Sequence, residues 1–238
     1  MPDEYAAFAS VYDAIYEAMK DYRVEADRLH VLIQSHKRTQ GSSLLDVACG
    51  TGLHDQYLRD RYQVEGLDVS EAMLAIARTR LPDVPFHHGD MSAFDLGRTF
   101  DAVTCLFSAV AHLGTVRRLN AAIECMARHV KAGGVLVVEP FISPDQWRDG
   151  TVGTNFVPEK RVARLTTSTR EGDSAVLEMH HFVDWDEQSS TAKYFVTRHQ
   201  MALYATQDYL DAFTAAGLAV TTDVEGLMGR GLFIGVKR

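Results

Sequence analysis

The sequence is poor in cysteine and in positive charge. Its 238 residues include three cysteines, Cys49, Cys105 and Cys125, an odd number that forms no C-x-x-C pair. We expect free thiols in a reducing compartment. Lys and Arg number 24 against 32 Asp and Glu, so the formal net charge is -8. Because proteins that bind DNA or RNA need a basic surface, this balance argues against a nucleic-acid partner.

Long hydrophobic runs and a basic leader are also absent. The longest apolar stretches are short, such as VLVV at 135–138, and cannot cross a bilayer. The first ten residues, MPDEYAAFAS, carry acids where a signal peptide carries positive charge. These absences predict a cytoplasmic protein that does not associate with membranes.

What the chain does contain is an alternation of apolar strands and amphipathic helices. It runs from SLLDVA at 43–48, through YQVEGLDV at 62–69, to VLVVEP at 135–140. Such alternation predicts a Rossmann-like α/β fold, in which helices cover both faces of a mostly parallel twisted sheet. Residues 1–40 have helical spacing and should form an N-terminal helical cap on a single domain, 1–238.

The pattern changes after Pro140. A polar segment at 141–160 is followed by extended stretches at 161–170, 175–185 and 193–204, with turn signals between them. These stretches predict an antiparallel β-meander. We expect residues 141–204 to form an insertion over the active site, because ligands of open α/β sheets bind at the carboxyl edge of the strands. The meander could act as a lid or as the surface of a homodimer.

A glycine-rich turn, LLDVACGTG at 44–52, follows the first predicted strand directly. A dinucleotide-binding loop has a third glycine where this chain has Asp55, and a carboxylate there is poorly suited to a pyrophosphate. A P-loop has a lysine and a hydroxyl where this chain has Leu53 and His54. The turn is therefore not expected to hold a phosphate.

Acidic residues end or follow the first three strands. Asp46 can accept from a ligand ammonium, and Asp68 can accept from both hydroxyls of a ribose. Asp90 can accept from an adenine amino group, beside a soft apolar wall formed by Met91. Together these residues fit a nucleoside that carries an amino-acid tail and no phosphate.

With these residues in this order, the chain resembles the class I S-adenosylmethionine-dependent methyltransferases. Their first motif matches DVACGTG at 46–52, with Ala48 in place of its first glycine and with Gly50 and Gly52 retained. HHGDMSAFDLGRTFDAVTC, REGDSAVLEMH and GRGLFIGV resemble the N,N-dimethyltransferases of dTDP-3-amino-3,6-dideoxyhexoses, the desosamine and mycaminose type. The resemblance implies S-adenosyl-L-methionine as cofactor, S-adenosyl-L-homocysteine as product, no metal, and a dTDP-amino sugar as substrate.

The resemblance also implies roles for single residues. Tyr12 and Tyr16 would lie over the cofactor or the acceptor, and Tyr22 would lie near the methionine carboxylate. His112 matches an active-site position near the acceptor amine, as a base or as a group that fixes its lone pair. Arg230 matches an arginine suited to the nucleotide diphosphate.

Several alternatives stay open. His112 could be structural, the tyrosines could be core aromatics, and Arg230 could pair with an acid. His181 lies on one of two strand faces, one of which should line the acceptor pocket; its neighbour His180 points the other way, so no metal pair is expected. The segments 141–143 and 227–228 depart from the family pattern, which leaves another small-molecule amine or hydroxyl open as acceptor.

Overall fold

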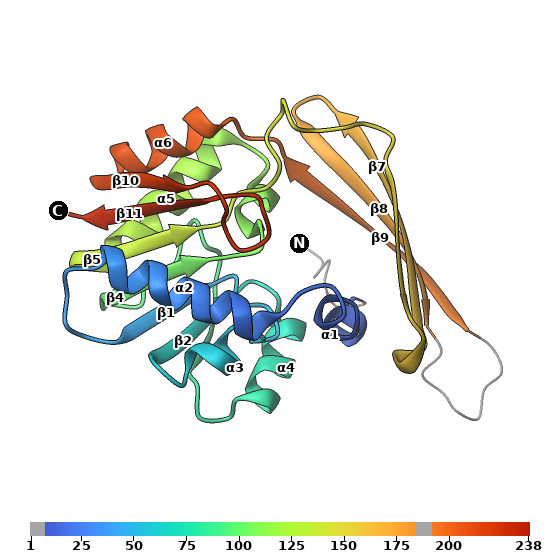
Figure 1. Ribbon diagram of the computed structural model, residues 1–238, viewed down its shortest axis with the longest axis horizontal. Coiled ribbons are helices and arrows are strands. Elements are labelled where there is room, and N and C mark those ends of the chain that lie inside the picture. Colours follow the sequence, from blue (N-terminus) through green and yellow to red (C-terminus); the bar gives the residue numbers. More distant parts are fainter. Residues whose placement is uncertain (1–7, 184–191) are drawn as a thin grey trace.

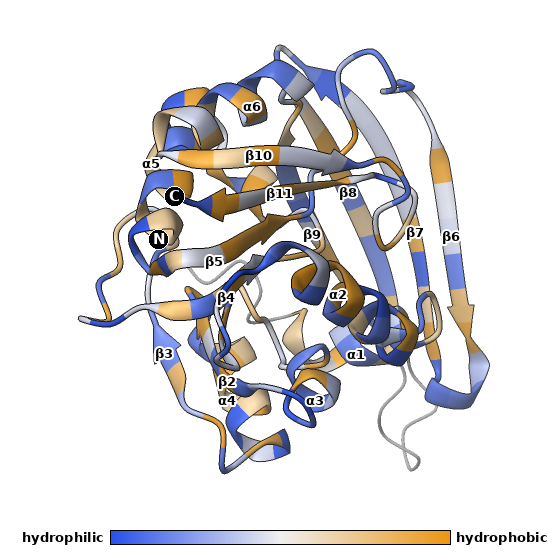
Figure 2. Ribbon diagram, turned by 60° about the vertical axis from the view of Figure 1, so that its left-hand side comes forward, coloured by the Kyte–Doolittle hydropathy of each residue, from blue (hydrophilic) through white to orange (hydrophobic). Residues whose placement is uncertain are grey.

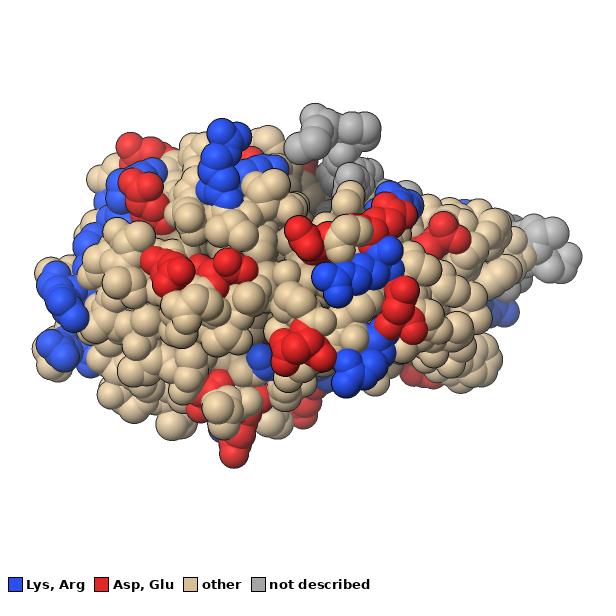
Figure 3. All heavy atoms as spheres, turned by 90° about the horizontal axis from the view of Figure 1, so that it is seen from above, with Lys and Arg blue, Asp and Glu red and all other residues tan. Residues whose placement is uncertain are grey.

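The computed structural model describes residues 8–183 and 192–238. Two sheets face each other across the helix α1 (Ala9–Glu17), which Figure 1 shows between the large sheet and a smaller antiparallel one. Among the residues described, no helix is long and apolar enough to cross a membrane. On the surface shown in Figure 3, acidic and basic side chains are interspersed rather than gathered by sign.

The large sheet has the predicted Rossmann-like form. Its strand order is β10-β11-β5-β4-β1-β2-β3, with parallel pairing from β5 to β3 and antiparallel pairing of β11 with β5 and of β10 with β11. Its strands are β1 (Ser43–Val47), β2 (Gln63–Asp68), β3 (Phe86–His88), β4 (Phe100–Cys105), β5 (Val130–Val138), β10 (Leu218–Asp223) and β11 (Leu232–Lys237).

Helices cover both faces of this sheet (Figure 2), and β1 is apolar on both sides. Leu44 packs in a cluster with α2, whereas Leu45 packs in a cluster with α5 and α6. Side chains at the N-caps fix where the helices begin: Asp21 for α2, Ser70 for α4 and Thr115 for α5. The helices after α1 are α2 (Tyr22–His36), α3 (Asp55–Leu58), α4 (Glu71–Arg80), η1 (Ala109–Leu113), α5 (Val116–Arg128), η2 (Pro158–Lys160) and α6 (Thr206–Ala215).

The antiparallel meander has one more strand than predicted. Its order is β6 (Val152–Val157), β7 (Val162–Glu171), β8 (Ser174–Val183) and β9 (Lys193–Ala202). The polar segment at 141–160 contains the additional strand, β6, an edge strand held by its pairing to β7 rather than by an apolar pattern. The last two residues of the stretch predicted at 175–185 lie outside the described residues.

The N-terminal segment predicted to be helical contains two helices, α1 and α2, among its described residues. Two boundaries differ from expectation. The helix expected at Leu53 begins at Asp55 and has four residues. The strand expected at 135–140 begins earlier, at Val130, and passes through Gly134. A Cβ at Gly134 would lie 2.9 Å from the Asp101 carbonyl oxygen, so this glycine permits close strand packing rather than marking a turn.

Candidate active site

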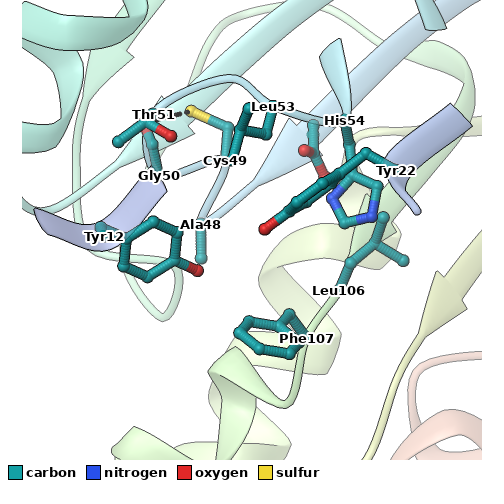
Figure 4. A pocket seen from close by; sticks show the side chains of 11 residues that line it. Tyr12, Tyr22, Ala48, Cys49, Gly50, Thr51, Leu53, His54, Leu106 and Phe107 are labelled. Carbon is teal, nitrogen blue, oxygen red and sulfur yellow. Dashed lines mark hydrogen bonds between the residues drawn. The ribbon is translucent and has the colours of Figure 1, made fainter. Parts of the chain in front are cut away.

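A pocket lies where β1 and β4 end, bounded by the loops that follow them and by the first two helices (Figure 4). In Figure 4 the rings of Tyr12, Tyr22 and Phe107 surround it from different elements. Its lining residues are Tyr12, Tyr22, Asp46, Ala48, Cys49, Gly50, Thr51, Leu53, His54, Leu106 and Phe107. The carboxyl edge of an α/β sheet is where such folds bind ligands, as the sequence predicted.

The loop after β1 has an unusual backbone. Ala48, Gly50 and Gly52 have φ values of 60°, 57° and 75°. At Gly50 an added Cβ would meet no atom within 4 Å, so a side chain there would project into the open pocket. Ala48 adopts the same left-handed region with a side chain, which costs about 1 kcal/mol or more. The surrounding contacts therefore hold this loop in a shape that a ligand can approach closely.

Two buried acids organise the loop. The Asp68 carboxylate accepts from the backbone N–H of Gly50 and from that of Ser70, both at 2.8 Å. Asp46 accepts from the Thr104 hydroxyl at 2.7 Å. Burial raises the pKa of Asp46, and the Thr104 hydrogen bond opposes this effect. Asp46 thus brings a buried carboxyl group to the pocket wall, which suits a cationic ligand.

The opposite end of the pocket holds a charged network that the sequence analysis missed. Glu25 accepts from His54 Nε2 at 2.8 Å and pairs with Lys20 Nζ at 2.8 Å. Lys20 Nζ also lies 4.0 Å from the Phe107 ring centroid. Burial lowers the pKa of Lys20, although Glu25 opposes it. Glu25 lies in α2, Lys20 just before it and His54 in the loop after β1, so no single stretch of sequence indicates this network.

α1 is fastened to the glycine loop by Asp13. Its Oδ1 accepts from the Thr51 hydroxyl at 2.6 Å, and its Oδ2 pairs with Arg80 of α4. This anchoring places the neighbouring Tyr12 ring in the pocket, 4.5 Å from the ring of Tyr16. The tyrosines predicted to lie over the ligands therefore sit at a fixed distance from the loop.

Tyr16 faces a second group of side chains, on the inner face of the antiparallel sheet. Its hydroxyl accepts from Arg164 Nη1 at 3.1 Å, and Asn155 Oδ1 accepts from Nε and Nη2 of the same arginine. Arg164 is 6% exposed, and the hydrogen-bond partners recorded for it on the described chain are all uncharged. A buried guanidinium beside neutral partners gives this compartment a positive potential.

Three histidines adjoin that arginine. His181 Nε2 and His199 Nε2 lie 3.1 and 3.2 Å from the Thr197 hydroxyl, and the His112 ring is 5.8 Å from that of His199. Burial lowers the pKa of each histidine to about 4, and the charge of Arg164 adds to the effect at His181 and His199. All three are neutral at pH 7, so His112 is a weak proton acceptor.

The segment after β4 joins the two groups. Phe107 and Ser108 have φ values of 52° and 62° in succession, a conformation that non-glycine residues rarely adopt. Fully buried Glu139 accepts from the Phe107 N–H at 2.7 Å and from Arg230 Nη2 at 3.0 Å, and Ser108 donates to the Pro140 carbonyl. This bracing puts the Phe107 ring 4.9 Å from that of Tyr16.

The predicted site residues thus fall into three places. The pocket itself contains Tyr12, Tyr22, Asp46, Ala48 and Gly50. The second compartment or its border contains Tyr16, His112, His181 and Arg230. The remaining residues, Gly52, Asp68, Asp90 and Met91, lie around the glycine loop or beyond it, outside the pocket lining.

Asp90 is already engaged by the protein. Its Oδ1 accepts from the backbone and hydroxyl of Ser92, and its Oδ2 pairs with Arg118 at 2.9 Å. Backbone and side-chain hydrogen bonds from Ser92, together with Arg118, hold its pKa below the ordinary value despite partial burial. Met91 packs against the main core cluster. An adenine amino group would have to share Asp90 with these donors.

The adjacent histidines His87 and His88 do not form a metal-binding pair. His87 Nε2 lies 2.9 Å from Glu65, whereas His88 Nε2 lies 2.9 Å from the Val69 carbonyl, so the two rings have separate partners. Over residues 8–183 and 192–238, no group of three His, Cys, Asp or Glu side chains could hold a metal ion. All three cysteines are free, as expected.

Comparisons with known proteins agree with this geometry. The model of a methyltransferase domain matches residues 44–134. A relative from Streptomyces fradiae, dTDP-3-amino-3,6-dideoxy-alpha-D-glucopyranose N,N-dimethyltransferase, is 44% identical over 96% of this chain and 90% of its own length. The crystal structure of Streptomyces venezuelae DesVI matches with a TM-score of 0.92 at 42% identity, over 97% of this chain and 98% of that chain.

A cofactor-bound structure is similar as well. S-adenosylmethionine-bound CalS10, an amino pentose methyltransferase from Micromonospora echinaspora, matches with a TM-score of 0.87 at 41% identity over 96% of this chain and 97% of that chain. The fold and the acidic pocket therefore define an S-adenosylmethionine-dependent methyltransferase. Within that class, the chain belongs to the family of the dTDP-amino-sugar N,N-dimethyltransferases.

Proposed function

We propose that this enzyme transfers methyl groups from S-adenosylmethionine to the amino group of a dTDP-linked deoxyamino sugar, and that it does so twice. The main support for this function is that similarity to the Streptomyces fradiae relative spans 96% of the chain. It therefore includes the antiparallel sheet that faces α1 as well as the cofactor-binding half. A chain that shared only the cofactor fold would lack this second half.

The residues of the pocket fit the proposed donor. Bound S-adenosylmethionine supplies an electrophilic methyl group on a sulfonium. The carboxylate of Asp46 would accept from its ammonium, and Gly50 lets the backbone approach it. Asp68 keeps the loop in shape through the Gly50 N–H and can also accept from the ribose. Tyr22 would lie at the amino-acid end of the donor, and we propose that no metal is needed.

The second compartment fits the proposed acceptor. Methyl transfer from a sulfonium is an in-line displacement, so the enzyme mainly aligns an uncharged amine. Neutral His112 would orient the amine lone pair rather than store its proton, because its pKa is about 4. We propose that Arg164 and Arg230 attract the diphosphate. Glu139 forms an ion pair with Arg230 and offsets part of its charge. The hydrogen-bond partners of Arg164 among the described residues are neutral.

The domain organisation is part of the proposal. Residues 1–40 would cap the donor pocket and 141–204 would cover the acceptor, within one domain. The outer face of the antiparallel sheet also supports a homodimer. There Phe156, Ala163, Phe182 and Tyr194 form one cross-strand row, in which Phe156 is 76% exposed. Sedimentation of the wild type and of Phe156→Asp tests this: a monomer in both would refute it.

The decisive experiment is mass spectrometry of dTDP-3-amino-3,6-dideoxyglucose incubated with the enzyme and S-adenosylmethionine. Successive gains of one and two methyl groups are expected, with chelator present to test the absence of a metal. The matched control is Asp46→Asn, which should lose most of the activity. No gain on the amino sugar, together with methylation of a non-sugar amine or hydroxyl, would refute the proposed acceptor.

A further inference from the structure

A second carboxyl group stands behind the pocket wall. Asp55, in the first turn of α3, is 0% exposed, and neither of its carboxyl oxygens accepts from an N–H or O–H of the described residues. The sequence suggested that this acid would repel a phosphate from the loop. The structure instead turns it inward, away from any ligand phosphate, and against another acid.

That other acid is Asp46. The side chains of Asp46 and Asp55 interact with each other, and Asp46 also holds the Thr104 hydroxyl. Two carboxylates in contact in a dry environment cannot both be ionised, so such pairs retain one proton. An ionised, buried Asp55 without any donor would be costly, whereas a protonated one can donate to Asp46.

The charged surroundings decide which member is ionised. His54 and the Thr104 hydroxyl favour the charged form of Asp46, and Asp68 opposes it. Asp55 is influenced by Asp46, which disfavours its ionisation, and by Arg80 of α4, which favours it. Burial and Asp46 together raise the pKa of Asp55 well above its ordinary value. Asp46 is thus the ionised partner, and it is the one that lines the pocket.

We infer that Asp55 is a positioning residue for the donor site: in its protonated form it donates a hydrogen bond to Asp46, and so fixes the orientation of the Asp46 carboxylate toward the ammonium of the cofactor. This inference rests on the proposed donor but not on the proposed acceptor. Under this inference the Asp55 carboxyl group holds its proton at neutral pH, before any substrate binds.

The direct test is the protonation state. Carbon-13 NMR of the enzyme labelled at its aspartate carboxyl groups should show one carboxylic-acid signal at pH 7. That signal should vanish in Asp55→Asn and persist in Asp60→Asn, a matched change at an exposed aspartate in the turn that follows α3. A wild-type spectrum in which every aspartate is ionised at pH 7, or an acid signal that survives Asp55→Asn, would overturn the inference.

Cofactor affinity supplies the second readout. The amide of Asp55→Asn can still donate to Asp46, so its Kd for S-adenosylmethionine should stay within about threefold of the wild type. Asp55→Leu fills similar space without a donor and should bind about tenfold more weakly. Equal Kd values for both variants would refute positioning through a hydrogen bond. Binding is measured without an acceptor, so failure here is distinguishable from failure of the proposed acceptor.

Discussion

Replacing His181 by phenylalanine should change how the stability of the enzyme depends on pH. His181 is fully buried, its ring stacks on Phe195 at 4.6 Å, and its pKa is lowered to about 4 by burial and by Arg164. Its pKa in the unfolded chain is about 6.5. The folded state therefore binds fewer protons than the unfolded state between these two values, so stability is present above pH 6.5 and is lost toward pH 4.

The magnitude follows from proton linkage. A group that gains one proton on unfolding changes the free energy of unfolding by about 1.4 kcal/mol per pH unit. Between pH 6 and pH 5, His181 is mostly protonated in the unfolded chain and mostly neutral in the folded one. It should account for about 1 kcal/mol of the stability lost in that interval. His112 and His199, with pKa values near 4, should contribute similar amounts.

The assay is urea unfolding at pH 6.0 and 5.0, followed by circular dichroism. His181→Phe should lose about 1 kcal/mol less than the wild type between the two pH values. Phe195→Leu, which disturbs the stacked ring without removing a titrating group, should be weakened equally at both pH values. An identical pH-dependent loss for the wild type and His181→Phe would refute the assignment of a neutral buried imidazole.

Three further predictions test the placement of the ligands. Asp13→Ala removes the anchor of α1 and should weaken S-adenosylmethionine binding about tenfold by calorimetry, while Asp60→Ala, at an exposed position, should not. Arg164→Met should raise the KM for the sugar nucleotide more than tenfold and leave cofactor affinity unchanged. Glu139→Gln should lower kcat, measured under saturating cofactor, because Phe107 and Arg230 lose a charged acceptor; unchanged kcat would contradict that role.

Much of the fold could be predicted because its signals are local. The run of apolar residues in β1 and the N-cap at Ser70 each specify one element and need no distant partner. β6 could not be predicted in this way. Its residues, VGTNFV, are mostly exposed, and they form a strand because their backbone pairs with β7. The last parallel strand, expected at 135–140, begins at Val130 and includes Gly134, whose missing side chain allows close strand packing.

The site divides in the same way. Asp46 and Gly50 could be predicted because the motif follows its strand directly, and the structure places both in the pocket. Arg164 could not, because its partner Tyr16 is 148 residues away in the chain and nothing in β7 marks it as buried. Lys20 and Glu25 have the sequence pattern of ordinary surface charges, and only the folded chain brings His54 against Glu25.

The two halves of the site have opposite electrostatic character, and the proposed reaction needs that difference. The donor pocket is lined by the buried carboxyl group of Asp46, with buried Asp68 behind its glycine loop, and both favour a cationic ligand. The acceptor compartment has buried Arg164 and histidines that stay neutral, which disfavour an ammonium. An amine that binds there is selected in its uncharged, nucleophilic form. Transfer moves positive charge from sulfur to nitrogen, toward Arg164. In the proposed reaction the methylated ammonium therefore gives its proton to solvent water, which restores the lone pair that a second methylation requires.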